Sequence, residues 1–392
     1  MKAIFLEQPG ELVIQEVPAP ECTAGMITVR VEAVAICDDD LSAYMGETEY
    51  QRYPIIPGRD AVGIVVEVGA QARGEPDGTS SRQSGSQESD GTNHRHHHAA
   101  RRFNPFVPPD DDDPHVISFA SYLNPKPAVG DRVVILPGRA QSDADSPACD
   151  GRSREDFVRT PGFNIDGTLR EFTVVPSEQC AVLPEGILMK EGLFLASTCK
   201  AQNAVDAGGV DELDTVTIMG AGDVGIIAAQ IVLAHGARPI LVDPSQARLE
   251  LARSLGITHT INPFAAYAAE EIEWITSGDM ADVVIDTAGD AEGMGSCLQF
   301  AGVGGRVVFT RKPAAKAPAD LRYVVKRELS VHTCRNARCD ADAALRLLTE
   351  GHVRVDPLVS ATLPFEAAPF IIPSIARNPG HYMRVVLSST PS

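Results

Sequence analysis

The amino-acid sequence predicts an α/β protein in which a doubly wound parallel sheet follows a smaller, barrel-like β unit. Its 392 residues are enough for about two domains of ordinary size. From about Pro184 onward, short apolar segments alternate with helical segments, the order typical of a parallel sheet with helices on both faces. Before that point, β-rich segments separated by Gly and Pro predominate, which favours a compact all-β unit.

We expect the first unit to span residues 1–185, with strands at KAIFLE, ELVIQEV, MITVRVEAVAI, AVGIVVEVG, GDRVVILP and LREFTVVP. Residues 72–125 interrupt it and are rich in Gly, Ser and charged residues. Such a segment cannot bury enough surface to offset its ordering entropy, so we expect a disordered insertion there. Its histidines (His94, His96, His97, His98) and the Asp run 110–113 could bind a metal, but a solvated insertion is the simpler interpretation.

We expect the second unit to span residues 186–335. The predicted elements are a helix at MKEGLFLASTCKAQNAVDAGG, a strand at TVTIMG, a helix at VGIIAAQIVLAHG, a strand at PILVD, a helix at QARLELARSLG, and strands at HTIN, ADVVIDT, RVVFT and ELSVHT. These strands read as apolar throughout, as expected for a sheet covered on both faces. Residues 336–392 contain one more helix and the strand HYMRVVLS, which we expect to return to the first unit.

The composition restricts the partners of the chain. A net charge of −19 argues against nucleic acid or an anionic membrane, since both require basic surface. The sequence contains no apolar run of the ~18 residues that a membrane span needs, and its first residues lack the apolar core of a signal peptide. The eight cysteines are scattered without a C-x-x-C pair. We therefore expect a cytoplasmic protein that acts on a small molecule.

A glycine-rich segment predicts a dinucleotide site. Gly220, Gly222 and Gly225 form G-x-G-x-x-G directly after the strand TVTIM and at the start of a helix, with Asp223 and Val224 between the last two glycines. The first Gly would allow a tight turn, the second would let the backbone approach a pyrophosphate, and the third would let helix and strand pack closely. The amino end of the helix then offers N–H groups to the phosphates.

Further residues predict which dinucleotide binds. Asp243 ends the second strand, 18 residues after Gly225, where a carboxylate accepts both ribose hydroxyls of NAD and repels the additional phosphate of NADP. The alternative is that Asp243 only caps the helix that follows. Arg248 could stack on the adenine, and Thr287, at the end of ADVVIDT, is another candidate contact. The sequence therefore predicts NAD.

The chain resembles the medium-chain dehydrogenase/reductase family, on its zinc-dependent alcohol and polyol dehydrogenase branch. The matching segments include VEAVAICDDDLSAYMGE, YPIIPGRDAVGIVVEVG, DGTLREFTVVP, VTIMGAGDVGIIAAQIVLAHGA and ILVDPSQARLELARSLG, and the resemblance covers nearly everything except about residues 72–125. It implies a GroES-like catalytic domain, a Rossmann domain, an active site in the cleft between them, and a homodimer or homotetramer.

The resemblance also implies a catalytic zinc, but its ligand positions are mostly changed. Cys37 is retained, whereas Arg59 stands where the family has its ligand His, and Asp60 stands for the neighbouring Glu. The third ligand aligns near Ala196. A protonated Arg offers no lone pair to a metal, and catalytic zinc needs three protein ligands. In the family, a separate lobe binds a structural zinc through four closely spaced Cys. The corresponding segment here, GRAQSDADSPACDGRSRED, contains only Cys149. If any metal binds, Cys37, Asp60 and Glu171 are the candidate ligands.

Without zinc, hydride transfer needs another group to move the proton or hold the oxyanion. Asp39 takes the place of the family's proton-relay hydroxyl and could act as a general base if burial raises its pKa. Arg59 could bind a substrate oxyanion, and Lys200 aligns close to the nicotinamide contact. With Cys37 and Asp60, these are the candidate catalytic residues. Each candidate also has a simpler interpretation. Asp38, Asp39 and Asp40 could form a solvated acidic turn, Arg59 and Asp60 could be a structural ion pair, and Lys200 could face solvent.

Four functions remain open from the sequence. The favoured one is an NAD-dependent oxidoreductase that acts on a polar alcohol or ketone, such as a sugar, polyol or cyclitol, without catalytic zinc. The others are a zinc alcohol dehydrogenase with altered ligands, a C=C reductase, and a non-catalytic NAD(H)-binding protein. Asp243 disfavours the C=C reductase, because zinc-less relatives of that kind usually prefer NADPH.

Overall fold

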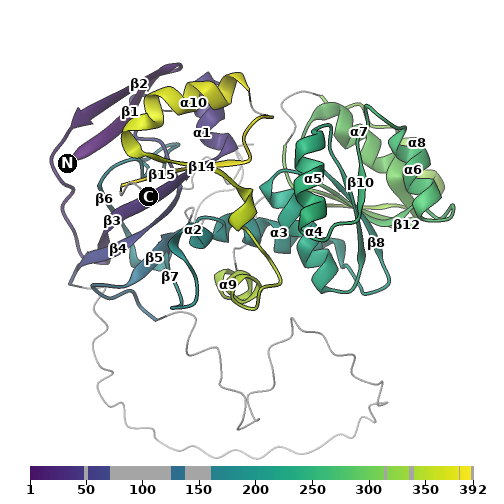
Figure 1. The fold of residues 1–392 in the computed structure, drawn as a ribbon, viewed down its shortest axis with the longest axis horizontal. Helices are drawn as coiled ribbons and strands as arrows, with labels where there is room; N and C mark the ends of the chain where they lie inside the picture. The colour runs from purple at the N-terminus through teal and green to yellow at the C-terminus, as the bar shows by residue number, and fades with distance from the viewer. Residues whose placement is uncertain are drawn as a thin grey trace, which may run out of the picture.

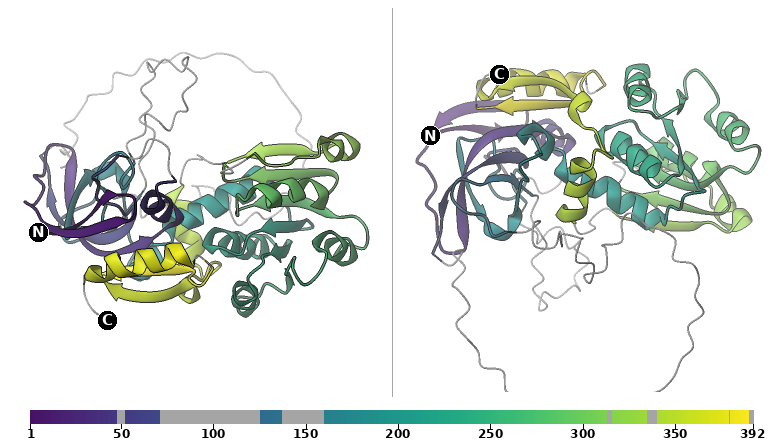
Figure 2. Two further views of the ribbon diagram at one scale, coloured as in Figure 1. Left: turned by 90° about the horizontal axis from the view of Figure 1, so that it is seen from above. Right: turned by 60° about the horizontal axis from the view of Figure 1, so that its bottom comes forward.

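A computed structural model describes residues 1–47, 52–70, 125–136, 160–312, 316–334, 340–378 and 380–389. These residues form two bodies that lie side by side, and the C-terminal segment runs back from the second body to the first (Figures 1 and 2). The predicted α/β class with a doubly wound sheet and a separate β unit is confirmed. The predicted insertion, with its His and Asp clusters, lies outside the described residues.

The first body is built on a mostly antiparallel sheet in the order β14-β15-β3-β4-β5-β7, with β6 also pairing with β3. The bounds of these strands are β3 (Met26–Ile36), β4 (Asp60–Val68), β5 (Arg132–Ile135), β6 (Phe172–Pro176), β7 (Cys180–Val182), β14 (Val359–Pro364) and β15 (Arg384–Ser388). A hairpin of β1 (Lys2–Gln8) and β2 (Glu11–Glu16) lies beside it. Because Val385 of β15 pairs with Ile36 of β3, the last strand of the chain is part of the first sheet.

The second body is a parallel sheet in the order β10-β9-β8-β11-β12-β13. Numbered along the chain, this is the order 3-2-1-4-5-6 of a doubly wound dinucleotide-binding sheet. The strand bounds are β8 (Thr215–Met219), β9 (Arg238–Val242), β10 (His259–Ile261), β11 (Ala281–Asp286), β12 (Ala301–Phe309) and β13 (Ser330–Thr333). The expectation that every strand is buried on both faces is wrong for β13, whose four residues are all exposed because it is the edge strand.

The helices differ from the expectation at several points. Residues 336–392, expected to contain one helix, contain two within their described part. The single helix predicted from Met189 is two helices, α2 (Met189–Gly192) and α3 (Leu195–Gly208), separated at Leu193 and Phe194. Both of these residues are fully buried, so packing overrides local helix propensity there. The other helices are α1 (Asp38–Met45), α4 (Asp223–Ala234), α5 (Gln246–Ser254), α6 (Ala268–Ile275), α7 (Ala291–Phe300), α8 (Leu321–Arg327), α9 (Ala341–Thr349) and α10 (Ala368–Arg377).

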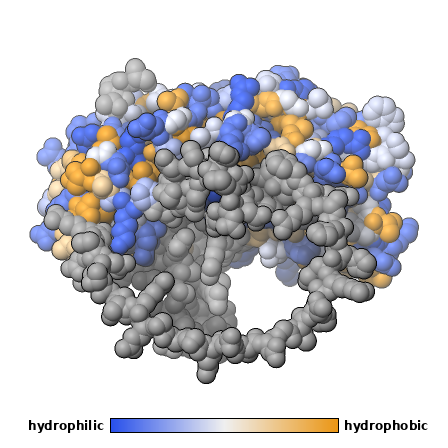
Figure 3. All heavy atoms as spheres, turned by 90° about the horizontal axis from the view of Figure 1, so that it is seen from below, coloured by the Kyte–Doolittle hydropathy of each residue, from blue (hydrophilic) through white to orange (hydrophobic). Residues whose placement is uncertain are grey.

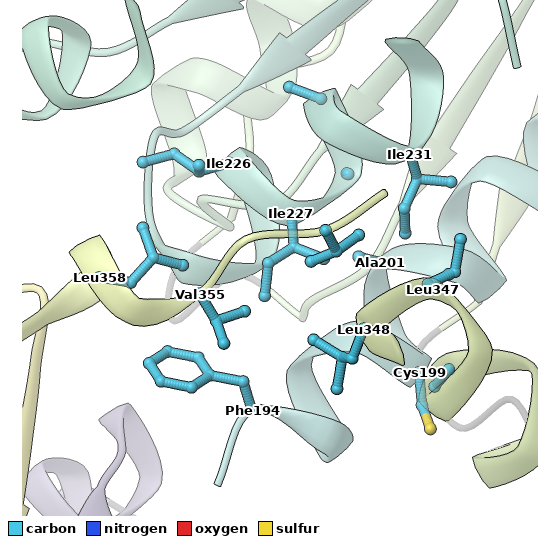
Figure 4. Close-up of a cluster of buried hydrophobic side chains, with 14 of the residues drawn as sticks. Phe194, Cys199, Ala201, Ile226, Ile227, Ile231, Leu347, Leu348, Val355 and Leu358 are labelled. Carbon is cyan, nitrogen blue, oxygen red and sulfur yellow. The ribbon is translucent and has the colours of Figure 1, made fainter. Parts of the chain in front are cut away.

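A continuous apolar core joins the two bodies. Phe194 at the start of α3 packs with Ile227 of α4, Leu348 of α9 and Val355, all of them buried (Figure 4). The same cluster extends into the first sheet through Val62 and Val134. Consequently α3 and the C-terminal segment are held against both bodies, and side chains from both can meet at the amino end of α4.

One face of the described residues is chemically mixed. Viewed from below, the described residues present a mixture of hydrophilic and hydrophobic side chains (Figure 3). In the described part of the chain, no helix has both the length and the apolar character that a membrane crossing requires.

One buried carboxylate in the second sheet gives a pH prediction. Asp286 ends β11 with no exposed surface, and burial raises its pKa to about 6, although the N–H groups of Ala288 and Gly289 favour the charged form. Because the folded pKa is raised, this group destabilises the fold increasingly as pH rises from about 4 to about 6. We expect Asp286→Asn to stabilise the protein at pH 7.5 by up to about 3 kcal/mol, and to show no advantage near pH 4.

Urea unfolding at several pH values measures this difference. Asp279→Asn, an exposed position shortly before the same strand, is the control for the loss of one charge. A D286N variant as stable as the wild type at pH 7.5 would contradict the prediction.

Candidate active site

The glycine-rich segment forms the turn between β8 and α4. Gly220 has φ +97°, a conformation that favours glycine. A Cβ on Gly225 would lie 1.8 Å from the carbonyl oxygen of Gly220, so the third glycine permits the close approach of helix and turn. A Cβ on Gly222 would meet nothing within 4 Å. The space beside Gly222 is therefore open to a ligand, as expected where a pyrophosphate approaches the backbone.

These glycines predict two different mutant phenotypes. Gly222→Ala should fold normally, because its φ of −71° suits any residue and its Cβ meets no protein atom. We expect this variant to bind NADH at least about tenfold more weakly, since the methyl group occupies the approach to the backbone. Gly225→Ala should instead lower the melting temperature, because its Cβ overlaps backbone.

Fluorescence titration with NADH and thermal denaturation separate the two effects. Gly186→Ala is the matched control, because its φ lies outside the left-handed region and its Cβ would also meet nothing within 4 Å. Normal NADH affinity in a folded G222A variant would show that the ligand lies elsewhere.

Asp243 is directed at the turn. Its Oδ2 accepts the N–H of Ala221 at 2.7 Å and its Oδ1 accepts the N–H of Ser245 at 2.7 Å. The interpretation as a simple helix cap is incomplete, because Ser245 is the N-cap of α5 and Asp243 also fixes the glycine-rich turn. Each carboxylate oxygen can accept more than one hydrogen bond, so the geometry still allows ribose hydroxyls to bind.

The other two predicted cofactor contacts have structural partners. Arg248 donates from Nη2 to the carbonyl oxygen of Tyr382 at 3.2 Å, which ties α5 to the segment before β15. Thr287 donates its hydroxyl to the carbonyl oxygens of Met219 and Gly220, at 2.8 and 3.1 Å. Thr287 therefore holds the turn in place, and its role as a direct cofactor contact stays a prediction.

The centre of the site is a buried guanidinium that the sequence did not single out. Arg384, the first residue of β15, is 4 % exposed. Its Nη1 donates to Asp60 at 3.2 Å, and its Nη2 donates to Asp223 at 2.6 Å and to Ser197 at 2.7 Å. Its guanidinium also lies over the ring of Phe194. Arg384 thus joins β4, α3 and the amino end of α4.

The two carboxylates respond differently to this cation. Burial raises the pKa of Asp60 above its ordinary value, although Arg384, Lys200 and Arg59 oppose that effect. Burial would also raise the pKa of Asp223, but Arg384, Ser197 and the N–H of Val224 together bring it below its ordinary value. Lys200 is itself exposed on α3 and acts on both carboxylates electrostatically.

Arg59 lies at the end of β4 nearest α1. Its Nη1 donates to Asp39 at 2.7 Å, and its side chain is 15 % exposed. Among the residues that the structure describes, its Nε is buried and has no hydrogen-bond partner. Burial would lower the pKa of Arg59, but the neighbouring acidic groups, Asp39 foremost, raise it, so the side chain remains a cation. The pair with Asp39 agrees with the expected Arg–Asp interaction, although the partner is not Asp60.

The acidic run after β3 is the first turn of a helix. Asp40 is buried and its carboxylate accepts the N–H and thiol of Cys37 and the N–H of Gly58. Asp39 is 47 % exposed, so the burial on which its role as a strong general base depended is not present. Asp38 pairs with Arg311 of the second body. The interpretation as a solvated acidic turn is therefore incomplete. Asp40 is buried and hydrogen-bonded, and only Asp38 and Asp39 reach the solvent.

The donor set does not suit zinc. Burial raises the pKa of the Cys37 thiol well above its usual range, with Asp40 adding to the effect, and the thiol donates to the Asp40 carboxylate. Asp60 is held by Arg384, and Glu171 accepts the backbone N–H of Lys2. Within the ranges that the structure describes, no three His, Cys, Asp or Glu side chains form a metal-binding group. Cys199 on α3 is disulfide-bonded, which the scattered cysteines did not predict.

Comparison with known proteins identifies the family. The model of the alcohol dehydrogenase GroES-like domain matches residues 23–101, and that of the zinc-binding dehydrogenase matches residues 224–350. This chain belongs to the medium-chain dehydrogenase/reductase family. As a member, it is an oxidoreductase of the alcohol and polyol dehydrogenase type. The GroES-like and Rossmann units named by the resemblance are thereby confirmed.

Several relatives of this dehydrogenase match nearly its whole length. An uncharacterized zinc-type alcohol dehydrogenase-like protein of Haemophilus influenzae is 27% identical over 386 residues, 98% of each chain. A putative D-xylulose reductase of Rhizobium meliloti is 24% identical and covers 93% of this chain and 92% of its own. A putative zinc-binding dehydrogenase from Sinorhizobium meliloti, solved with NADP, is 24% identical with a TM-score of 0.77, covering 99% and 98% of the two chains.

Proposed function

We propose that this dehydrogenase transfers hydride between NAD(H) and a polar alcohol or ketone, of the sugar, polyol or cyclitol class, without catalytic zinc. The observation that carries the proposal is Arg59. This cation stands where the resemblance places a zinc-ligand His, and its buried Nε has no partner within the described part of the chain. A buried donor without a partner costs free energy, and a substrate oxygen would satisfy it.

Arg59 supplies the charge that the oxygen of the substrate requires. When an alcohol is oxidised, its oxygen becomes negative as its proton leaves and before the hydride is transferred, and a preorganised guanidinium stabilises that charge. NAD, when bound, would supply the acceptor for the hydride of the carbon that carries this oxygen. The protein groups that hold the alcohol are then Arg59, which donates to its oxygen, and Asp39, which accepts its hydrogen.

Asp39 also gives the proton a route to water. Its carboxylate contacts Arg59 at 2.7 Å and is partly exposed, so it lies between the guanidinium and solvent. We infer that Asp39 relays the proton rather than acting as a base of high pKa. Lys200 and Asp60 complete the charge balance around the reacting atoms, and Cys37 acts as a neutral thiol bonded to Asp40.

Asp243 supports NAD over NADP. Its carboxylate is fixed by the N–H groups of Ala221 and Ser245 at the end of β9, where a phosphate on the ribose would meet a negative charge. The NADP bound to the structural relative is a property of that protein. The name of the D-xylulose reductase relative supports a polyol as the substrate class here.

The remaining parts of the proposal concern organisation. We propose the catalytic domain over residues 1–185, the NAD-binding domain over 186–335 and the C-terminal return over 336–392. We also propose a homodimer or homotetramer in a cytoplasmic enzyme. The edge strand β13 supports assembly, because all of its residues are exposed and its outer backbone is available to a second copy.

The test is reduction of NAD and NADP with a panel of polyols, using enzyme in which the histidines at 94 and 96–98 are replaced so that they carry no metal. We expect polyol-dependent NAD reduction, at least about tenfold lower efficiency with NADP, and full activity after chelation. About one zinc per chain, with activity lost on its removal, would establish the altered-ligand zinc enzyme instead. NADH binding without turnover of any substrate would point to a non-catalytic protein.

A further inference from the structure

The first residue of α4 carries a carboxylate where the bound cofactor needs positive charge. Asp223 follows Gly222, the glycine beside the open space, and begins the helix whose amino end is expected to face the pyrophosphate. N–H groups and the helix dipole at such an end attract anions. A side-chain carboxylate at this point takes the same electrostatic position as a phosphate.

The contacts of Asp223 are those that a phosphate would make. Its Oδ1 accepts the N–H of Val224 at 2.8 Å, and its Oδ2 accepts Arg384 Nη2 at 2.6 Å and the hydroxyl of Ser197 at 2.8 Å. The carboxylate therefore holds a backbone donor of the helix terminus and the buried guanidinium beside it.

We propose that Asp223 is an internal competitor for the cofactor pyrophosphate, which takes over Arg384 and the Val224 N–H when the dinucleotide binds. The inference rests on the proposed NAD(H) binding and adds the residue that limits its affinity. In the free protein, Asp223 keeps Arg384 paired. On binding, the phosphates gain that guanidinium while Asp223 loses it.

The local charge balance makes this competition unfavourable for the cofactor. One guanidinium, that of Arg384, faces the carboxylates of Asp60 and Asp223, so the buried group already carries one net negative charge. Lys200 acts on both carboxylates from the surface. Two phosphate charges added beside this group repel Asp223 directly, so replacing Asp223 with a neutral isostere should strengthen binding.

Asp223→Asn tests the proposal, because the amide removes the charge while its oxygen can still accept from the Val224 N–H and its NH2 group can donate to the Ser197 hydroxyl. Asp320→Asn is the matched control: Asp320 is also at the amino end of a helix and pairs with an arginine, Arg322, at 2.6 Å. Fluorescence titration measures the Kd for NADH, and competition measures that for ADP-ribose. Thermal denaturation of the free proteins reports whether each variant folds.

We expect D223N to lower the Kd of both ligands at least about tenfold, with D320N unchanged. The affinity of D223N should also fall more steeply as salt is raised, because repulsion no longer offsets attraction to Arg384. Asp223→Ser gives the same comparison if the amide perturbs folding. A folded D223N or D223S that binds no tighter than wild type overturns the proposal. If neither the wild type nor any variant binds NADH or ADP-ribose, the proposed cofactor itself is wrong.

Discussion

Replacing Arg59 should reduce kcat/KM for polyol oxidation by about 10²- to 10³-fold, the loss typical of removing one preorganised donor from a developing oxyanion. The buried Nε of Arg59 has no hydrogen-bond partner in the described ranges, and its Nη1 donates to Asp39, so the guanidinium is fixed and still has donors to offer. Arg59→Met removes the charge and keeps much of the volume. Arg59→Lys keeps the charge but loses the planar arrangement of donors, and should recover only part of the activity.

Steady-state kinetics with NAD, together with NADH titration, check this prediction. The loss should fall mainly on kcat, while the Kd for NADH changes little, because the cofactor loop lies on the other body. Arg322→Gln, at an exposed ion pair far along the chain, is the control for losing a guanidinium. Activity within threefold of wild type in R59M would remove Arg59 from the mechanism and leave its pairing with Asp39 as a structural feature.

Replacing Arg384 should lower the free energy of unfolding by about 3–5 kcal/mol, the cost of leaving buried carboxylates without their cation. In Arg384→Met, Asp60 loses its ionic partner and Asp223 loses its shortest contact with a cation. Both folded-state pKa values should then rise. Because protonation removes the buried charge, the deficit relative to wild type should shrink as pH falls from 7 towards 4.

Urea denaturation at several pH values measures the deficit, compared at constant m. Arg306→Met is the control, because its pair with Asp214 is more exposed and should contribute at most about 1 kcal/mol. The triple variant R384M/D60N/D223N should regain much of the loss, since it replaces an unpaired charge cluster with neutral groups. A loss below 1 kcal/mol in R384M would show that water solvates these carboxylates.

Much of the arrangement of elements could be predicted because most strands carry a local signal, although β7 and β14 were not predicted. The G-x-G-x-x-G segment between an apolar strand and a helix marked the turn between β8 and α4, and the structure shows the expected tight turn at Gly220 and close packing at Gly225. The break between α2 and α3 could not be predicted, because Leu193 and Phe194 are compatible with a helix and are displaced from one only by tertiary packing.

Arg384 was missed for a different physical reason. Its contacts with Asp223 and Asp60 connect residues 161 and 324 positions apart in the sequence. No spacing rule relates such positions. The one available signal was a lone charged residue inside the apolar strand MRVVL, since a charge in a buried strand needs a partner. The role expected of Asp39 depended on its burial, but Asp40 is the buried carboxylate of this run. A run of three Asp gives no indication of which one is buried.

The pairing of β15 with β3 has a consequence for synthesis on the ribosome. The strands of the second sheet all lie in one continuous stretch, from Thr215 to Thr333. The first sheet, in contrast, is completed only by β14 and β15, which follow that stretch in the sequence. The nucleotide-binding unit can therefore fold while β3 still has an open edge, and unpaired strand edges promote aggregation. β15 closes that edge and in the same step brings Arg384 to Asp60 and Asp223, so this buried charge cluster forms only after the whole second sheet has been synthesised.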